Sequence, residues 1–160
     1  MVRLNELRPN EAAVEPPNRF DAGLTFIGII RTPWSSRRDC PRQGRLDGPL
    51  CRIEVHEPWV AALEGIERFE RLEVLYWLHE SRRDLVRQAP GGDGDPRGTF
   101  ALRSPVRPNP IGLALVAMVG RKGSVLSVRG LDCLDRTPLI DLKPDRCAFS
   151  PRAAGGAGGL

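Results

Sequence analysis

The stretch Arg103-Ser-Pro-Val-Arg-Pro-Asn-Pro-Ile-Gly-Leu-Ala-Leu-Val-Ala-Met-Val119 decides the fold because it joins a stiff loop to a strand. Its three prolines each fix the backbone φ angle and remove an N–H donor, so neither a helix nor a central strand can cross residues 103–110. The apolar run at residues 113–119 is typical of a strand. The loop presents planar polar groups on Arg103, Arg107 and Asn109, which suit an anionic or polar ligand. A solvated surface connection explains the same loop equally well.

Other segments of the chain also have the composition of short strands. They lie at residues 24–30, 50–55, 72–79, 99–102, 124–129 and 139–144. A buried helix would give the same apolar run at 72–79. Residues 58–65 begin with Pro and end with Gly, as a short helix does. Because 17 Gly and 15 Pro indicate many turns and no βαβ repeat is present, we predict a mainly all-β fold. The expected architecture is a small, mostly antiparallel β-barrel with one or two short helices.

The two ends of the chain differ from its middle. Residues 1–20 are charged and contain Pro-Pro, which predicts a flexible leader, and the Ala/Gly-rich residues 151–160 predict a disordered tail. Residues 21–150 have the size of one domain. Within it, residues 81–98 contain Pro-Gly-Gly and Asp-Gly-Asp-Pro and are expected to form a mobile loop.

Composition narrows the classes of function. No apolar run approaches the ~20 residues of a membrane span, and the N-terminus has no apolar signal core, so we expect a cytoplasmic protein with reduced thiols. Four Cys without CxxC spacing and two His predict no metal site. The net charge of +4 favours phosphate-bearing partners weakly. Contacts to phosphate groups of a partner and a solvated basic surface account equally well for Arg31, Arg37, Arg38 and Arg45.

Three further polar segments are candidates for ligand binding. Pro41-Arg42-Gln43 presents a guanidinium and an amide from a stiff backbone, inside a long segment without periodicity. His79 and Glu80 follow the predicted strand 72–79, where a capping His and a solvated Glu are the alternative. Residues 130–138 form a polar loop with two carboxylates.

Four segments together resemble the TsaA-like family, also called the TrmO or VirR family. They are residues 26–33 (FIGIIRTP), 41–43 (PRQ), 99–115 (TFALRSPVRPNPIGLAL) and 130–144 (GLDCLDRTPLIDLKP), in the family's order. The resemblance implies a small antiparallel barrel that binds S-adenosylmethionine and forms homodimers. It also implies a tRNA adenine-N6 methyltransferase, because characterised members methylate N6 of the threonylcarbamoyl-adenosine beside the tRNA anticodon.

The resemblance also implies which residues contact the cofactor. Acidic groups would neutralise the sulfonium and the ammonium of S-adenosylmethionine, and Arg103 would pair with its carboxylate. Leu113 would form an apolar surface beside the adenine. The full implied set is Pro41, Arg42, Gln43, His79, Glu80, Arg103, Leu113, Asp132, Cys133, Leu134 and Asp135.

The methyl acceptor needs its own positioning groups. Our candidates are Asn109 to orient the acceptor, and Asp141 with Lys143, which would share one face of the last strand. A structural role for each is the alternative. The chain departs from the family at Asp145, where members usually have Tyr, and at Arg136, where Gly is common. We also expect it to lack the C-terminal domain of many bacterial members.

The sequence therefore predicts an S-adenosylmethionine-dependent methyltransferase acting on threonylcarbamoyl-adenosine in tRNA. Two alternatives use the same pocket. One is a methyltransferase that acts on a small molecule, and the other is a non-enzymatic S-adenosylmethionine-binding regulatory module.

Overall fold

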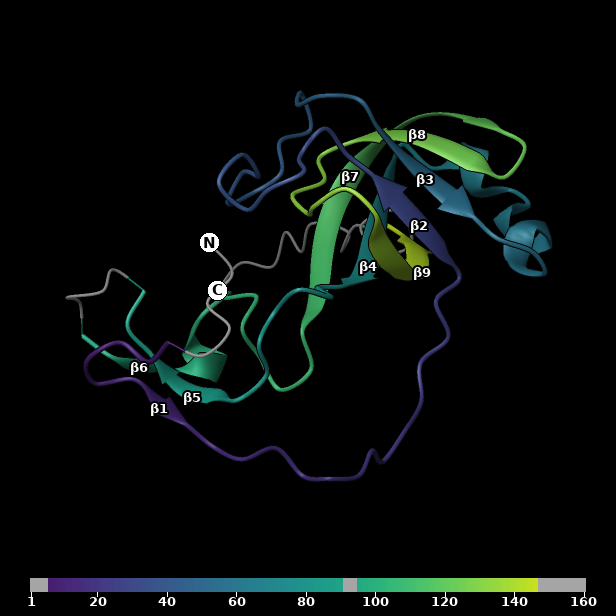
Figure 1. The fold of residues 1–160 in the computed structure, drawn as a ribbon. Coiled ribbons are helices and arrows are strands. Elements are labelled where there is room, and N and C mark those ends of the chain that lie inside the picture. Colours follow the sequence, from purple (N-terminus) through teal and green to yellow (C-terminus); the bar gives the residue numbers. More distant parts are fainter. Residues whose placement is uncertain (1–5, 91–94, 147–160) are drawn as a thin grey trace, which may run out of the picture.

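A closed barrel of antiparallel strands occupies the upper right of the molecule in Figure 1. The structure is a computed structural model that describes residues 6–90 and 95–146 of the chain. Around the barrel the strands follow the order β2-β3-β8-β7-β4-β9. Their bounds are β2 Gly28–Arg31, β3 Cys51–Val55, β4 Arg71–Trp77, β7 Ile111–Lys122, β8 Val125–Arg129 and β9 Thr137–Pro144. The predicted all-β barrel is confirmed.

Alternation of side chains along each strand fills the barrel. In β4, Leu72, Val74 and Tyr76 point inward and are buried, while the residues between them face outward. Strand β7 repeats the pattern with Ala114 and Val116. The inward residues of all six strands meet in one apolar cluster.

Gly112 lets β7 pass closely over the aromatic ring of Tyr76. The two residues are direct partners in the β4–β7 pairing, and a Cβ atom at position 112 would overlap that ring. Glycine at the end of the Pro110-Ile111-Gly112 sequence therefore has a local reason in this fold, because only glycine leaves room for the buried tyrosine.

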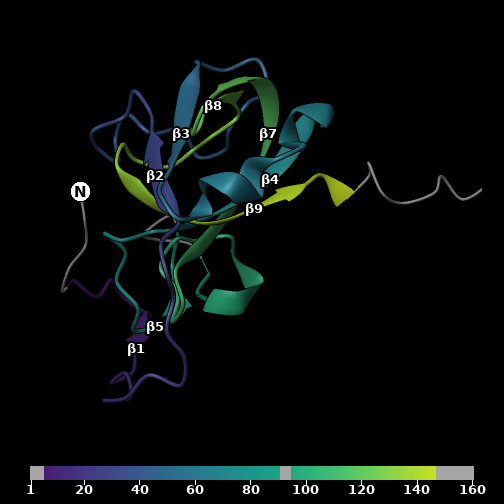
Figure 2. The same ribbon diagram turned by 90° about the vertical axis from the view of Figure 1, so that its right-hand side faces the viewer.

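A second, smaller sheet lies beside the barrel, where Figures 1 and 2 place it at one end of the molecule. It consists of β1 (Ala12–Ala13), β5 (Leu85–Gln88) and β6 (Arg97–Gly98) in the order β1-β5-β6, followed by the 3-10 turn η3 (Thr99–Ala101). We call the part of the chain that builds it the lobe, meaning residues 6–22, 81–90 and 95–110.

Buried hydrogen bonds hold the lobe together. The hydroxyl of Thr99 donates to the Leu85 carbonyl at 2.6 Å. The Gln88 amide donates to Thr99 Oγ1 at 2.7 Å and to the Val106 carbonyl at 2.9 Å. These bonds tie the proline-rich loop of residues 102–110 to β5.

Some local expectations were wrong. Inside the segment expected to be a mobile loop, residues 85–88 and 97–98 form the strands β5 and β6. Residues 99–101 form a 3-10 turn instead of a strand. The short helix expected at 58–65 is present as the 3-10 helix η1 (Trp59–Leu63), and a second 3-10 helix, η2 (Ile66–Arg68), follows it. Their short length reflects Gly65, whose φ of 84° interrupts any continuous helix.

The expected division into leader, domain and tail stays a prediction, with one structural difference at its start. Ala12 and Ala13 form β1 inside the segment expected to be a flexible leader. The tail of residues 151–160 lies outside the described residues. No helix in the described part of the chain is long and apolar enough to span a membrane.

Candidate functional site

A cavity of about 520 Å³ is lined by residues of both the barrel loops and the lobe. Four segments line it: the β2–β3 loop, residues 78–80 after β4, the lobe with Arg8, and the β8–β9 loop together with the first residue of β9. Its volume is in the range of small-molecule binding sites. The lining side chains that the following argument uses are Arg8, Arg37, Arg42, Leu78, His79, Glu80, Arg82, Leu102, Arg103, Val106, Cys133 and Leu134.

The β2–β3 loop and the β8–β9 loop are fastened to each other. A Cβ atom on Gly44 would overlap the Gly130 carbonyl, so the two backbones touch there. The Cys40 thiol donates to the Asp132 carbonyl at 3.0 Å. Because of these contacts, Arg37 and Arg42 of the first loop line the same cavity as Cys133 of the second.

The β8–β9 loop is also held from the barrel side. The Tyr76 hydroxyl donates to Asp132 Oδ1 at 2.5 Å, and burial together with this neighbouring carboxylate raises the pKa of Tyr76 far above its usual value. Thr32 donates its backbone N–H to Asp135 Oδ1 at 3.1 Å and its hydroxyl to the Cys133 carbonyl at 2.9 Å. Both carboxylates of the loop therefore bind protein groups.

The cavity wall is strongly basic. Arg8, Arg37, Arg42 and Arg103 line it, and Glu80 is the one carboxylate among the described lining residues. Arg82 also lines the wall, but it forms an ion pair with Asp84 at 2.7 Å. This arrangement favours a ligand that carries at least one anionic group.

Six residues from the sequence prediction meet in this cavity. They are Arg42, His79, Glu80, Arg103, Cys133 and Leu134. His79 Nε2 lies 3.9 Å from Glu80 Oε1. The other predicted cofactor contacts are not among the lining residues: Pro41, Gln43, Leu113, Asp132 and Asp135. Leu113 is 49% exposed on the outer face of β7.

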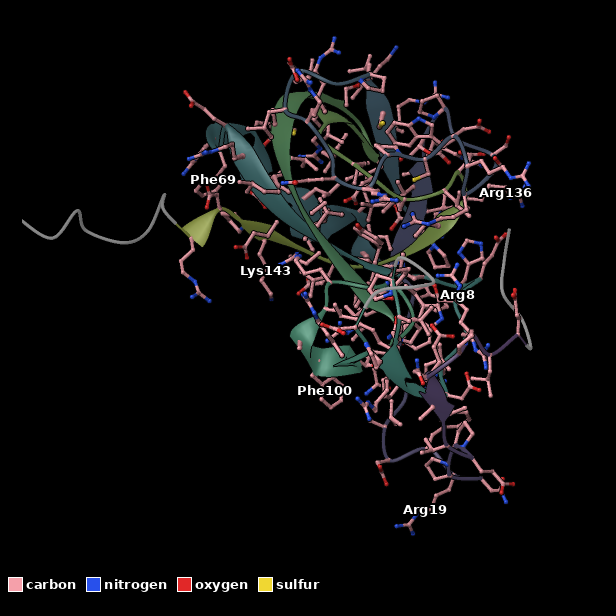
Figure 3. The ribbon with its side chains drawn as sticks, turned by 90° about the vertical axis from the view of Figure 1, so that its left-hand side faces the viewer. Arg8, Arg19, Phe69, Phe100, Arg136 and Lys143 are labelled. Atoms are coloured by element: carbon pink, nitrogen blue, oxygen red, sulfur yellow. The ribbon has the colours of Figure 1, made fainter. Side chains whose placement is uncertain are left out.

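The three residues proposed to act on the acceptor lie outside the cavity. Asn109 Oδ1 accepts a hydrogen bond from Arg83 Nη2 at 3.3 Å. Lys143 Nζ lies 2.6 Å from Asp141 Oδ2 on the outer face of β9, and this neighbour raises the pKa of Lys143. Figure 3 shows Lys143 well apart from Arg8, which lies where the barrel meets the lobe.

Sequence reasoning missed Arg8 as a site residue and gave Arg37 a different role. Arg8 belongs to the segment expected to be a leader, and no local pattern distinguishes it from the other arginines. Its position follows from the pairing of β1 with β5, which joins residues more than seventy positions apart.

The two departures from the family pattern have clear structural consequences. Arg136 has a φ of 65°, a left-handed conformation that glycine adopts without strain. Asp145 is 7% exposed and forms an ion pair with Arg71 at 3.0 Å, which joins the end of β9 to the start of β4.

The family model of the tRNA-methyltransferase O N-terminal domain matches residues 29–148. The chain belongs to this family. It is 57% identical over 153 residues to the "Probable S-adenosyl-L-methionine-binding protein VirR" of Rhizobium radiobacter, which covers 96% of the chain and 87% of that protein. It is 38% identical to the "tRNA (adenine(37)-N6)-methyltransferase" of Escherichia coli, over 74% of the chain and 55% of that protein.

Solved structures of the TrmO family share this fold. A TrmO crystal structure superposes with a TM-score of 0.67 and 30% identity, covering 88% of the chain and 63% of that chain. TrmO from Pseudomonas aeruginosa gives a TM-score of 0.64 at 30% identity, over 88% and 62%. The present chain therefore spans about three fifths of the length of the solved TrmO chains.

Proposed function

We propose that this TrmO-family chain is an S-adenosylmethionine-dependent methyltransferase that acts on tRNA and binds its cofactor in the cavity between the barrel and the lobe. The observation that carries the proposal is the convergence of Arg42, His79, Glu80, Arg103 and Leu134 on one cavity. These residues come from four segments that lie far apart in the sequence, and the family resemblance implies each of them as a cofactor contact. The name of the Rhizobium relative supports binding of S-adenosylmethionine, and the name of the Escherichia relative supports methylation of an adenine in tRNA.

The chemistry of the lining residues fits the cofactor. S-adenosylmethionine carries a carboxylate, an ammonium, a sulfonium and an adenine. Arg103 suits the carboxylate as a bidentate donor, and Glu80 suits the cationic groups. Leu78, Leu102 and Val106 supply apolar surface for the adenine. The residues present therefore match each part of the molecule.

Positioning is what the protein contributes to such a transfer. The bound cofactor supplies an activated methyl group, and rate acceleration comes from holding the acceptor nitrogen in line with it. Asp141 and Lys143 stay candidates for the acceptor side, although they lie outside the cavity. Asn109 is fixed by Arg83, which suits a group that must orient a substrate.

As the acceptor we propose N6 of threonylcarbamoyl-adenosine beside the tRNA anticodon, methylated in the cytoplasm. The name of the Escherichia relative supports an adenine in tRNA. The basic cavity wall supports an acceptor with an anionic group, such as the threonyl carboxylate. A small-molecule acceptor and a non-enzymatic regulatory role are the alternatives that the experiments below separate.

We further propose that the chain forms a homodimer through the outer face of β7. Ile111, Leu113, Leu115 and Val119 are all 40% or more exposed there. Leu75 and Trp77 of β4 pair with Leu113 and Ile111, which widens the apolar surface. An apolar row of this kind on a strand favours burial against a partner. Leu113→Asp should shift the protein to monomer in analytical ultracentrifugation, and an unchanged sedimentation coefficient would contradict this interface.

Isothermal calorimetry with S-adenosylmethionine tests the central proposal. We expect binding to the wild type and at least tenfold weaker binding to Arg103→Ala, because a charge-assisted pair is lost. Arg87→Ala is the matched control, since Arg87 is exposed in the same lobe and does not line the cavity. Absence of binding to the wild type would refute the cofactor assignment.

Mass spectrometry of tRNA nucleosides identifies the acceptor. Purified protein and cofactor should add one methyl group to threonylcarbamoyl-adenosine in tRNA that lacks this methylation. Cofactor binding without transfer to any nucleoside would favour the regulatory module. Transfer to an added small molecule, with tRNA unchanged, would favour the second alternative.

A further inference from the structure

A short N-terminal segment of the lobe forms part of the cavity wall although it precedes the family domain. We call residues 6–14 the strap. The family model begins at residue 29, so the strap lies outside it. Within the strap, β1 pairs with β5 through Ala12 opposite Arg87 and Ala13 opposite Leu85. The strap therefore adds an edge strand to the small sheet.

Polar contacts fasten the strap along its whole length. Glu11 accepts the Ala89 N–H on Oε1 at 3.1 Å and the Arg8 N–H on Oε2 at 3.0 Å. The Val14 N–H donates to the Asp84 carbonyl at 2.8 Å. At the other end, Arg82 Nη1 donates to the Glu6 carbonyl at 2.7 Å. These bonds fix the backbone on both sides of Arg8.

The Arg8 guanidinium is held against the cavity. Its Nη1 donates to the carbonyls of Ala89 and Pro90 at 3.1 and 3.3 Å, and the side chain lines the cavity together with Arg103. A guanidinium has five N–H donors, and both of these bonds leave from Nη1. Figure 3 shows Arg8 where the lobe meets the barrel, whereas Arg19 lies at the far end of the lobe.

The charge of the cavity indicates which kind of ligand group Arg8 would bind. A bound S-adenosylmethionine molecule is a net monocation, with one carboxylate against an ammonium and a sulfonium. Arg37, Arg42 and Arg103 already line the cavity, with Glu80 as the described lining carboxylate. A further guanidinium fixed on this wall would be repelled by its surroundings unless it met an anionic group.

We propose that Arg8 is a ligand-binding residue of the cavity and pairs with a carboxylate of the bound ligand. The proposal rests on the proposed function. The carboxylate has two possible sources, the methionine part of the cofactor and the threonyl part of the modified adenosine. The guanidinium of Arg8 is preorganised to donate hydrogen bonds to either carboxylate, because its two hydrogen bonds to backbone carbonyls hold it in place.

Calorimetry with two probes isolates the first source. S-adenosylhomocysteine contains the carboxylate, and 5′-deoxy-5′-methylthioadenosine lacks the entire amino-acid part. If Arg8 binds the cofactor, Arg8→Gln weakens S-adenosylhomocysteine binding about tenfold and leaves methylthioadenosine binding unchanged. Arg8→Lys keeps the charge and restores part of the affinity. Arg19→Gln, an exposed arginine of the same N-terminal segment, binds both probes like the wild type.

Transfer kinetics isolate the second source. If Arg8 binds the acceptor, Arg8→Gln leaves the affinity for both probes unchanged and raises KM for threonylcarbamoyl-modified tRNA about tenfold, with kcat retained. Its affinity for tRNA without the threonylcarbamoyl group then equals that of the wild type.

Two results would overturn the inference. One is Arg8→Gln behaving like Arg19→Gln in both experiments. The other is Arg8→Gln weakening methylthioadenosine binding as much as S-adenosylhomocysteine binding, because Arg8 would then only support the wall. A wild-type protein that binds neither probe and transfers no methyl group would instead refute the proposed function.

Discussion

The barrel and the lobe are both built from strands, but different interactions hold them in place. In the barrel every strand pairs on both sides, and residues such as Ile53, Leu72 and Leu126 are completely buried. The lobe has strands of two to four residues, and its sheet is open. Side-chain bonds from Gln88 and Thr99 replace much of the missing core. Stability is therefore concentrated in the barrel.

The residues that line the cavity are distributed the other way. Arg8, Arg82, Gln88 and Arg103 of the lobe line the cavity, whereas no inward residue of β4 or β7 does. Binding surfaces commonly use the less stable parts of a protein, since those parts can adjust to a ligand. The comparison implies that damage to the barrel lowers global stability and that damage to the lobe lowers affinity first.

The largest effect is expected from matched leucine truncations in the two regions. Leu126 in the barrel and Leu85 in the lobe are both 0% exposed. Leu126→Ala should lower the free energy of unfolding by about 3 kcal/mol, the middle of the range for buried leucines. Leu85→Ala should cost less globally and weaken S-adenosylhomocysteine binding, because the lobe opens locally. Urea denaturation, hydrogen exchange and calorimetry measure this, and equal losses of stability would contradict the comparison.

A glycine in each region gives the next contrast. Gly112→Ala should lower the free energy of unfolding by about 2 kcal/mol, because the new methyl group overlaps the buried Tyr76 ring. A Cβ at Gly98 in the lobe meets no atom within 4 Å, and its φ of −58° suits alanine. Gly98→Ala should therefore be neutral or slightly stabilising in urea denaturation. A tolerated Gly112→Ala would show that β7 can move away from Tyr76.

The same contrast explains what sequence could predict. Strands are predicted at residues 50–55 and 124–129 because the alternation of apolar and polar side chains is a local feature of the sequence. The structure has β3 and β8 at these places. The strands of the lobe are too short for such a pattern, and β1 exists only through its pairing with a distant segment. For the site, the family resemblance implied Arg42, Glu80 and Arg103, which meet in the cavity. Arg8 carries no motif, so only the fold could reveal its place.

Alkaline pH should weaken the barrel specifically. Burial raises the pKa of the Cys51 thiol in β3 to about 11. In the unfolded chain a thiol ionises near pH 9, so the unfolded state binds fewer protons than the folded state above that pH. This contribution to stability is complete below pH 9 and is lost as the pH rises towards 11, by about 1 kcal/mol at pH 10.

Urea denaturation at pH 7, 9 and 10 measures that loss. Cys51→Ala should have a lower stability at pH 7 and a smaller further loss between pH 9 and 10 than the wild type. No cysteine lies in the described residues of the lobe. The rate of hydrogen exchange in the lobe should therefore change with pH only as the intrinsic exchange rate of an amide does. An identical pH slope in both proteins would exclude Cys51 as the cause.

The smallest effect compares two residues with the same backbone conformation. Asn10 in the strap and Arg136 in the β8–β9 loop both have a φ of 65°. Asn tolerates this left-handed conformation because its short polar side chain can hydrogen-bond the nearby backbone, whereas Arg has the same strain at its Cβ atom without that compensation. Arg136→Gly should therefore raise the free energy of unfolding by about 0.5 kcal/mol, after the greater flexibility of glycine in the unfolded chain is subtracted.

Asn10→Gly serves as the control and should change stability by less than the error of urea denaturation. The bond from the Arg136 N–H to the Ile30 carbonyl uses the backbone and survives the substitution. A loss of stability in Arg136→Gly would mean that the exposed arginine side chain stabilises the barrel by more than its backbone strain costs. The β8–β9 loop also carries Cys133 and Leu134, which line the cavity. If Arg136→Gly binds S-adenosylhomocysteine as the wild type does, the backbone strain at Arg136 contributes nothing to ligand binding.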